Sequence, residues 1–314
     1  MSSASASSGP SASSEPVAEP AALPLDEQQL RSRDHTALWT RRVRPVGPAR
    51  ARLAFVHGFG EHGGRYVRTL RWFAARGFDA HVLDLRGHGR SAGRRTFVRR
   101  WGEFLDDVEA FAAHVEALRP AADGAASAGA ARTPLFLVGH SMGGLVLARA
   151  LQERRDRLPP LRGAALMSPF LRVKMPLPAW KTAAGRVLSR WLPWFRLPAD
   201  VDVAVLSRDP EVGRAYLADP LVEKGATARW YTEAVQAQRD ALAQAARLDL
   251  PLLFMHGEDD RLVDVEGTRR LYTDAASRDK ELRLWPGARH ELFNESNKDE
   301  VCAHLLGWLE GRLS

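Results

Sequence analysis

Residues 135–144 read LFLVGHSMGG, an apolar run followed by a turn in which Ser141 stands between glycines. An amphipathic pattern over residues 142–155 follows and indicates a helix. A G-x-S-x-G turn between a strand and a helix is typical of a nucleophile elbow, where small neighbours allow a tight turn that exposes the serine hydroxyl. The N-terminus of the following helix also favours negative charge that develops beside the serine. The stretch therefore predicts a nucleophilic Ser141 at the carboxyl edge of a sheet.

The alternation of strand and helix continues on both sides of this turn. Short apolar runs predict strands at residues 53–56, 80–83, 135–138, 164–167, 252–255 and 282–285. Spacings of three and four predict helices at residues 65–76, 104–118, 142–155, 227–246, 267–276 and 300–313. An antiparallel edge strand is expected within residues 35–43. This order predicts an α/β fold, with a mostly parallel sheet flanked by helices and a helical cap insertion.

Composition divides the chain into a tail, a core and an insertion. Residues 1–32 are rich in Ser, Ala and Pro and are expected to be a disordered tail. Residues 33–169 and 230–314 are expected to form the α/β core, with an Ala- and Gly-rich loop at 120–133. Residues 170–229 are too long for an ordinary connection and have a helical pattern of their own, so we expect a cap or lid over the active site.

The expected cap contains an apolar stripe with basic neighbours. The stripe consists of Trp180, Ala184, Val187, Leu188, Trp191, Trp194 and Phe195, and its basic neighbours are Lys181, Arg186, Arg190 and Arg196. A basic amphipathic helix with tryptophans suits a lipid interface. The alternative is that the stripe packs the cap onto the core. Residues 171–229 hold ten Lys or Arg and six Asp or Glu, a net charge of +4, which disfavours a site for the cationic amine of a peptide.

Composition also excludes several classes of protein. The net charge is +7, and no basic run interleaved with aromatics predicts a nucleic-acid partner. The single cysteine, Cys302, excludes a disulfide within the chain and a zinc site built of cysteines. No secretory signal and no apolar stretch approaching a membrane span is present in the sequence. We expect a cytoplasmic protein without metal or cofactor, with peripheral membrane contact through the cap as a hypothesis.

A serine nucleophile needs a base and an acid that orients the base. On this kind of sheet they follow in the order serine, acid, histidine, which narrows the ten histidines to His290 and His304. His304 lies among apolar residues of a helix, whereas His290 follows a strand through the turn 286–289, where a base is expected. The loop after the preceding strand offers four candidate acids, Glu258, Asp259, Asp260 and Asp264.

Several short motifs follow one another along the chain. They are HGFGEH at 57–62 with Arg65 and Tyr66, DLRGHGRS at 84–91, GHSMGG at 139–144, Ser168-Pro169, LSR at 206–208, Tyr216 with DPL at 219–221, G-x-x-D at 257–260 and G-A-x-H at 287–290. From about residue 52 to residue 308 the chain resembles the monoacylglycerol lipase family of serine hydrolases, which has the α/β-hydrolase fold. The resemblance implies a triad of Ser141, Asp260 and His290, with Asp260 favoured over Asp259.

The same resemblance implies the remainder of the site. The backbone N–H groups of Phe59 and Met142 would form the oxyanion hole. The positions that match the family's glycerol-binding groups are Glu61, Arg65, His140 and Tyr216. A purely structural reading stands beside that role, with Glu61 and Arg65 as a local ion pair and His140 as a packed neighbour of the elbow. Phe59 departs from the smaller residue common in the family and is expected to narrow the acyl pocket.

The leading hypothesis is hydrolysis of single-chain lipid esters, above all monoacylglycerol, through an acyl-enzyme on Ser141. Alternatives are another carboxylesterase or lysophospholipase, a serine aminopeptidase, or a non-catalytic binding module. Epoxide hydrolases and dehalogenases on this fold need a carboxylate at the elbow, so Ser141 argues against them. The expected partner is the lipid ester substrate, and the sequence does not indicate an oligomeric state.

Overall fold

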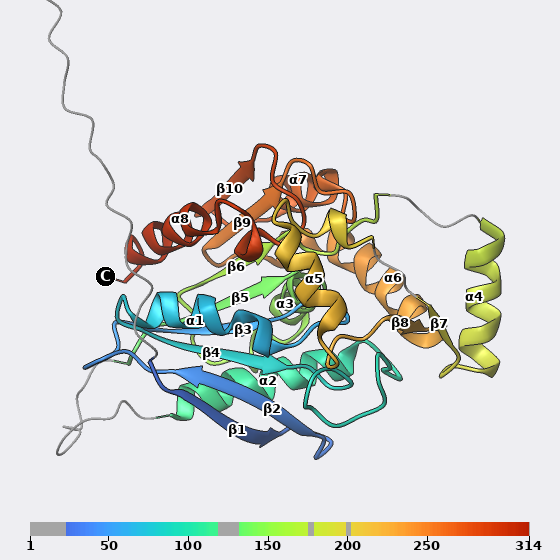
Figure 1. The fold of residues 1–314 in the computed structure, drawn as a ribbon, viewed down its shortest axis with the longest axis horizontal. Coiled ribbons are helices and arrows are strands. Elements are labelled where there is room, and N and C mark those ends of the chain that lie inside the picture. The colour runs from blue at the N-terminus through green and yellow to red at the C-terminus, as the bar shows by residue number, and fades with distance from the viewer. Residues whose placement is uncertain (1–22, 119–131, 175–178, 199–201, 314) are drawn as a thin grey trace, which may run out of the picture.

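The computed structural model describes residues 23–118, 132–174, 179–198 and 202–313 and contains an eight-stranded sheet (Figure 1). In spatial order the strands are β1 (Leu25–Arg31), β2 (Ala37–Val43), β4 (Phe78–Asp84), β3 (Ala51–Val56), β5 (Leu135–His140), β6 (Gly163–Met167), β9 (Leu252–Gly257) and β10 (Lys280–Trp285). β2 pairs antiparallel with β1 and β4, and all other pairs are parallel. The six strands expected from apolar runs and the α/β fold class are confirmed.

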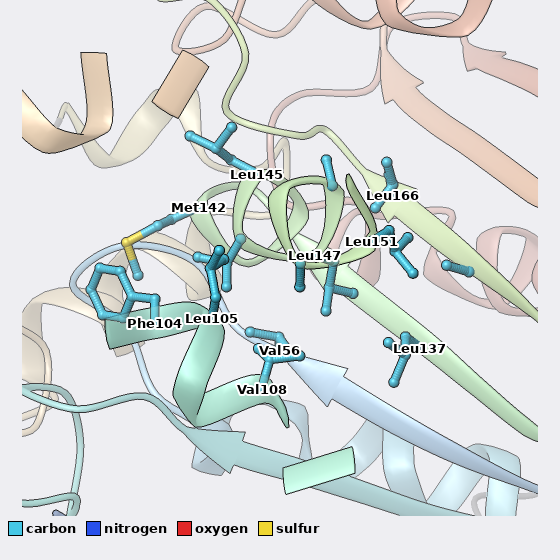
Figure 2. Packing of buried hydrophobic residues seen from close by; sticks show 14 of the residues in the cluster. Val56, Phe104, Leu105, Val108, Leu137, Met142, Leu145, Leu147, Leu151 and Leu166 are labelled. Carbon is cyan, nitrogen blue, oxygen red and sulfur yellow. The ribbon is translucent and has the colours of Figure 1, made fainter. Parts of the chain in front are cut away.

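Helices cover both faces of this sheet. They are α1 (Val67–Ala74), α2 (Gly102–Ala117), α3 (Met142–Glu153), α6 (Ala228–Ala243), α7 (Val265–Asp274) and α8 (Lys298–Glu310). Successive residues of a strand face opposite sides: Ala54 and Val56 pack with α2, α3 and α6, while Leu53 and Phe55 pack with α1 and α8. Figure 2 shows part of the first of these two cores, where side chains from β3, β5, β6, α2 and α3 gather around α3. This packing fixes α3, and with it the elbow, against the sheet.

The N-terminal boundary of the core differs from the expectation. Leu25–Arg31 forms β1, so the prediction of a disordered tail over residues 1–32 is wrong for these residues, while residues 1–22 lie outside the described part. β1 pairs along its whole length with β2, from Leu25↔Val43 to Arg31↔Ala37. Only Leu30 of this edge strand is buried, so its sequence has little apolar periodicity to reveal it. β2 is antiparallel as expected but is not the edge strand, because β1 covers it.

The expected cap region lies between β6 and α6. It contains α4 (Ala179–Trp191), α5 (Pro210–Ala218) and an antiparallel ribbon of β7 (Arg196–Pro198) and β8 (Gly225–Thr227). In Figure 1, α4 lies at the right-hand margin, beyond α6. The domain boundaries at 169/170 and 229/230 stay predictions, and most of the expected loop at 120–133 falls outside the described residues. No helix in the described part has the length and apolar character needed to cross a bilayer.

Candidate active site

The elbow has the strained geometry that a tight strand-to-helix turn requires. Ser141, between β5 and α3, has φ 51° and ψ −116°, a backbone conformation that non-glycine residues rarely adopt. Its N–H donates to the carbonyl of Met167 at 2.9 Å, which ties the turn to β6. A Cβ on Gly139 would lie 2.6 Å from the carbonyl oxygen of Gly143, and one on Gly143 would lie 2.2 Å from that of Val56. Side chains are therefore excluded at both glycines of the motif.

A buried carboxylate orients the histidine that the sequence singled out. Asp260 Oδ2 lies 2.7 Å from His290 Nδ1, and Asp260 Oδ1 accepts the backbone N–H groups of Leu262 and Val263 at 2.8 and 2.9 Å. Asp259 is exposed, so the structure brings Asp260 and not its neighbour to His290.

The pair is electrostatically coupled. Burial alone would raise the pKa of Asp260, but His290 and His256 beside it hold that pKa well below its usual range. Burial alone would lower the pKa of His290, but the Asp260 carboxylate raises it above its ordinary value of 6.5. Asp260 is thus ionised at neutral pH and stabilises the protonated form of His290.

Ser141 and His290 line one cavity of about 280 Å³. Its polar lining includes Glu61, Arg65, His140, Tyr216, Arg261 and Glu291, and its apolar lining includes Phe59, Phe170, Val173, Leu206, Trp230, Leu262 and Val263. Ser141 Oγ makes no hydrogen bond to another described residue. The hydrogen bond between a nucleophile and its base often forms only when substrate binds. The cavity around Ser141 is thus lined partly by polar and charged side chains and partly by apolar ones.

Glu61 is the centre of the polar lining. Its Oε1 accepts the N–H of Gly58 at 2.6 Å and the hydroxyl of Tyr66 at 2.8 Å, and it lies 3.0 Å from His140 Nδ1. Its Oε2 lies 2.9 Å from Arg65 Nη1. Burial alone would raise the pKa of Glu61, but His140 and Arg65 keep that pKa well below its usual range. Glu61 therefore stays charged and holds the loop before Phe59.

The other polar residues connect Glu61 to His290. Arg65 makes a two-pronged ion pair with Glu291 at 2.8 Å on each oxygen and lies 5.2 Å from the ring centre of Tyr216. His140 Nε2 lies 3.2 Å from the backbone oxygen of His290. Burial raises the pKa of Tyr216 to about 12, so its hydroxyl stays protonated. The structure thus brings together all four expected glycerol-binding positions, and adds Glu291, which the sequence reading missed although it directly follows His290.

The two expected oxyanion donors stay a prediction, and the structure shows the elements that carry them. Phe59 lies in the loop after β3, and its N–H has no hydrogen-bond partner among the described residues. Met142 is the first residue of α3, where an N–H has no acceptor within the helix. His57, the first residue of the HGFGEH motif, was given no role from sequence and holds the loop: its Nδ1 lies 2.7 Å from the carbonyl of Gly58, and its Nε2 accepts the N–H of Leu85 at 3.0 Å. Burial lowers the pKa of His57, which keeps the ring neutral as these two bonds require.

The other candidate base, His304, lies away from the cavity. His304 does not line the cavity; its Nε2 lies 2.7 Å from Glu281 at the sheet edge, in keeping with a structural role. Within the described ranges, no group of three His, Cys, Asp or Glu side chains is placed to hold a metal ion.

Comparison with known proteins identifies the family. Residues 47–297 match a family model described as serine aminopeptidase, S33. A monoacylglycerol lipase of Mycolicibacterium smegmatis is 33% identical over 279 residues, covering 88% of this chain and 92% of the relative. Phospholipase YtpA of Bacillus subtilis is 30% identical over 269 residues, covering 84% and 95%. The crystal structure of Paleococcus ferrophilus monoacylglycerol lipase has a TM-score of 0.76 at 28% identity, covering 88% and 99%. The chain belongs to the monoacylglycerol lipase family, within the serine aminopeptidase S33 group of α/β-hydrolases.

Proposed function

We propose that this protein hydrolyses monoacylglycerols to fatty acid and glycerol through an acyl-enzyme on Ser141. The observation that carries the proposal is the Asp260–His290 pair, 2.7 Å apart, whose His290 lines the same cavity as Ser141. His290 takes the serine proton while Oγ attacks the ester carbonyl, and the N–H groups of Phe59 and Met142 stabilise the oxyanion. His290 then protonates the departing glycerol oxygen and activates the water that releases the fatty acid.

The lining of the cavity supports a substrate with one polar and one apolar part. Arg65, Glu61 and Tyr216 offer charged and hydroxyl groups to a glycerol head, while the aromatic and aliphatic lining suits a single acyl chain. The relative from Mycolicibacterium smegmatis is named monoacylglycerol lipase, and the match covers 92% of it, which supports the same substrate.

The test is a side-by-side assay of the purified protein. A series of monoacylglycerols is compared with triacylglycerols, lysophospholipids and aminoacyl amides by kcat/KM, with Ser141→Ala as the blank. We expect the monoacylglycerols to be cleaved best. A preference for triacylglycerols or amides would overturn the substrate assignment, and absence of Ser141 labelling by a fluorophosphonate would favour a non-catalytic binding module.

A lysophospholipid is the second candidate substrate. Arg261 lines the cavity, is exposed, and makes no ion pair with another described residue, so its guanidinium is available to a phosphate. The relative from Bacillus subtilis is named a phospholipase. Arg261→Ala separates the two candidates, because it should lower kcat/KM for lysophospholipids and leave that for neutral monoacylglycerols little changed.

The aminopeptidase reading has less support. Glu61 and Glu291, the two carboxylates among the residues that line the cavity, are both ion-paired with Arg65. A free peptide amine would compete with Arg65 for them.

We also propose that α4 and the residues after it meet a lipid surface. The side of α4 that faces α6 is small and polar: Gly185 and Ser189 are buried, and Ser189 Oγ lies 2.7 Å from the hydroxyl of Thr232. Trp180, Val187 and Trp191 are instead 68, 61 and 74% exposed, and Trp194 and Phe195 are exposed as well. Most of the aromatic stripe therefore faces solvent, and of the aromatic residues named here Trp194 has a contact with the core, 5.6 Å from its ring centre to the guanidinium of Arg94.

Co-sedimentation with liposomes tests this surface. Trp191→Ala with Trp194→Ala should weaken binding to anionic vesicles while turnover of a short soluble ester stays unchanged. Leu217→Ala is the matched control, because it removes an exposed apolar side chain on α5, away from the α4 stripe. Equal binding by the double variant and the wild-type protein would contradict the proposal that this surface meets lipid.

A further inference from the structure

Trp230 contacts the side chains of both proposed oxyanion donors. Its ring lies against that of Phe59, with ring centres 3.8 Å apart and planes at 33°. Its indole N–H donates to Met142 Sδ at 3.3 Å, in a buried contact. Phe59 and Met142 come from two different elements, the loop after β3 and the start of α3. One side chain therefore contacts the two elements whose N–H groups must point at the same oxygen.

The position of Trp230 is itself fixed from a third element. It lies in the first turn of α6, where Thr227 Oγ1 accepts its N–H at 3.3 Å. Thr227 Oγ1 also donates to the carbonyl of Thr96, and Thr96 Oγ1 donates to the carbonyl of Gly225, each at 2.7 Å. Phe170 lies nearly parallel to the indole, with ring centres 6.2 Å apart. With only 5% of its surface exposed, the indole has little freedom to leave its partners.

We propose that Trp230 is a positioning residue for the oxyanion hole, holding the loop of Phe59 and the start of α3 at the separation that the oxyanion needs. The inference rests on the proposed esterase function. Stabilisation of the oxyanion depends on donors preorganised about 3 Å from the charge, and a misplacement of about 1 Å can cost about a hundredfold in rate. Because Trp230 lies in the first turn of α6, which directly follows β8, it also links the oxyanion hole to the β7–β8 ribbon.

The test compares Trp230→Ala and Trp230→Phe with the wild-type protein on p-nitrophenyl acetate, a soluble ester whose acyl group is too short to need the apolar wall. Trp230→Ala should lower kcat by about ten- to a hundredfold, with a much smaller change in KM. Its affinity for a short trifluoromethyl ketone, which forms a tetrahedral oxyanion on the serine, should fall in parallel with kcat/KM. Trp230→Phe should recover part of the loss, because a phenyl ring keeps the contact with Phe59 but has no N–H for Met142.

The matched control is Trp308→Phe, the same substitution at an equally buried tryptophan on α8 that does not line the cavity. A wild-type kcat in Trp230→Ala would overturn the inference, as would a loss that is absent for the acetate and grows with acyl length, since Trp230 would then be only part of the wall. If Trp230→Ala does not fold, an unchanged kcat and ketone affinity in Trp230→Phe would overturn it equally. Failure of the esterase function on which the inference rests is distinct, because the wild-type protein would then hydrolyse neither the acetate nor any lipid ester.

Discussion

Replacing Asp260 by Asn tests the triad most sharply, because the structure dictates how the amide must sit. The Oδ1 position accepts two backbone N–H groups, those of Leu262 and Val263. An amide oxygen can accept both and an NH₂ group neither, so the oxygen of the substituted side chain would stay there. The NH₂ group then faces His290 Nδ1 at the place of Oδ2, 2.7 Å away in the native protein. His290 would have to present an unprotonated Nδ1, which moves its proton to Nε2 and removes the base that Ser141 needs.

Two estimates bound the loss. The wrong tautomer costs about 10⁴ in kcat in a Ser-His-Asp enzyme, or about 5 kcal/mol. The lost attraction between the carboxylate and the imidazolium, for charges about 4 Å apart at an effective dielectric constant of about 20, is about 4 kcal/mol, or about 10³. The two effects overlap, so we expect Asp260→Asn to lower kcat by about 10³- to 10⁴-fold.

The assay is p-nitrophenyl acetate hydrolysis by Asp260→Asn and Asp259→Asn side by side, with thermal melting as the check on folding. The exposed Asp259 has no part in this geometry, and its variant should keep nearly all activity. Equal losses in the two variants, or a loss below about tenfold at Asp260, would refute the argument.

The pH profile gives an independent readout of the same pair. A general base must be neutral, so wild-type kcat/KM should fall as pH falls through the raised pKa of His290, which lies above 6.5. In Asp260→Asn the burial of His290 is no longer opposed by that carboxylate, and the residual activity should fall at a lower pH. An acid limb that does not move would contradict the assignment.

Three further predictions concern the serine, the polar network and the acyl wall. Ser141→Ala should keep less than about a hundredth of wild-type kcat and lose fluorophosphonate labelling, with an unchanged melting temperature; substantial turnover would make another residue the nucleophile. Glu61 has a folded-state pKa held below its ordinary 4.5, so its stabilising contribution is present above that pH and is lost as pH falls. Melting temperatures at pH 7 and pH 4 should therefore differ less for Glu61→Gln than for the wild-type protein, and equal differences would be evidence against a charged Glu61. Phe59→Ala should raise kcat/KM for long-chain relative to short-chain monoacylglycerols, because its ring lines the cavity; an unchanged ratio would show that Phe59 does not limit chain length.

The elbow could be predicted from sequence because its cause is local. Gly139 and Gly143 are required by backbone approaches of less than 3 Å, and the strand before and the helix after each show their own periodicity. His290 followed from chain order, because its strand and turn are also continuous segments. The apolar periodicity of the sequence did not predict β1, because only Leu30 of this strand is buried. Its hydrogen bonds to β2 make it a strand.

Residues 135–144 and the strand–helix alternation were by themselves enough to predict the fold class, the elbow at Ser141 and His290 as the base. The resemblance favoured Asp260, but only the tertiary structure decided which carboxylate faces His290, because adjacent residues of a loop point in different directions. It alone placed Glu291 on Arg65 and Trp230 on Phe59, and turned the aromatic side of α4 away from the core. These contacts join residues up to 226 positions apart, and no local pattern of spacing records which distant side chains will meet when the elements pack.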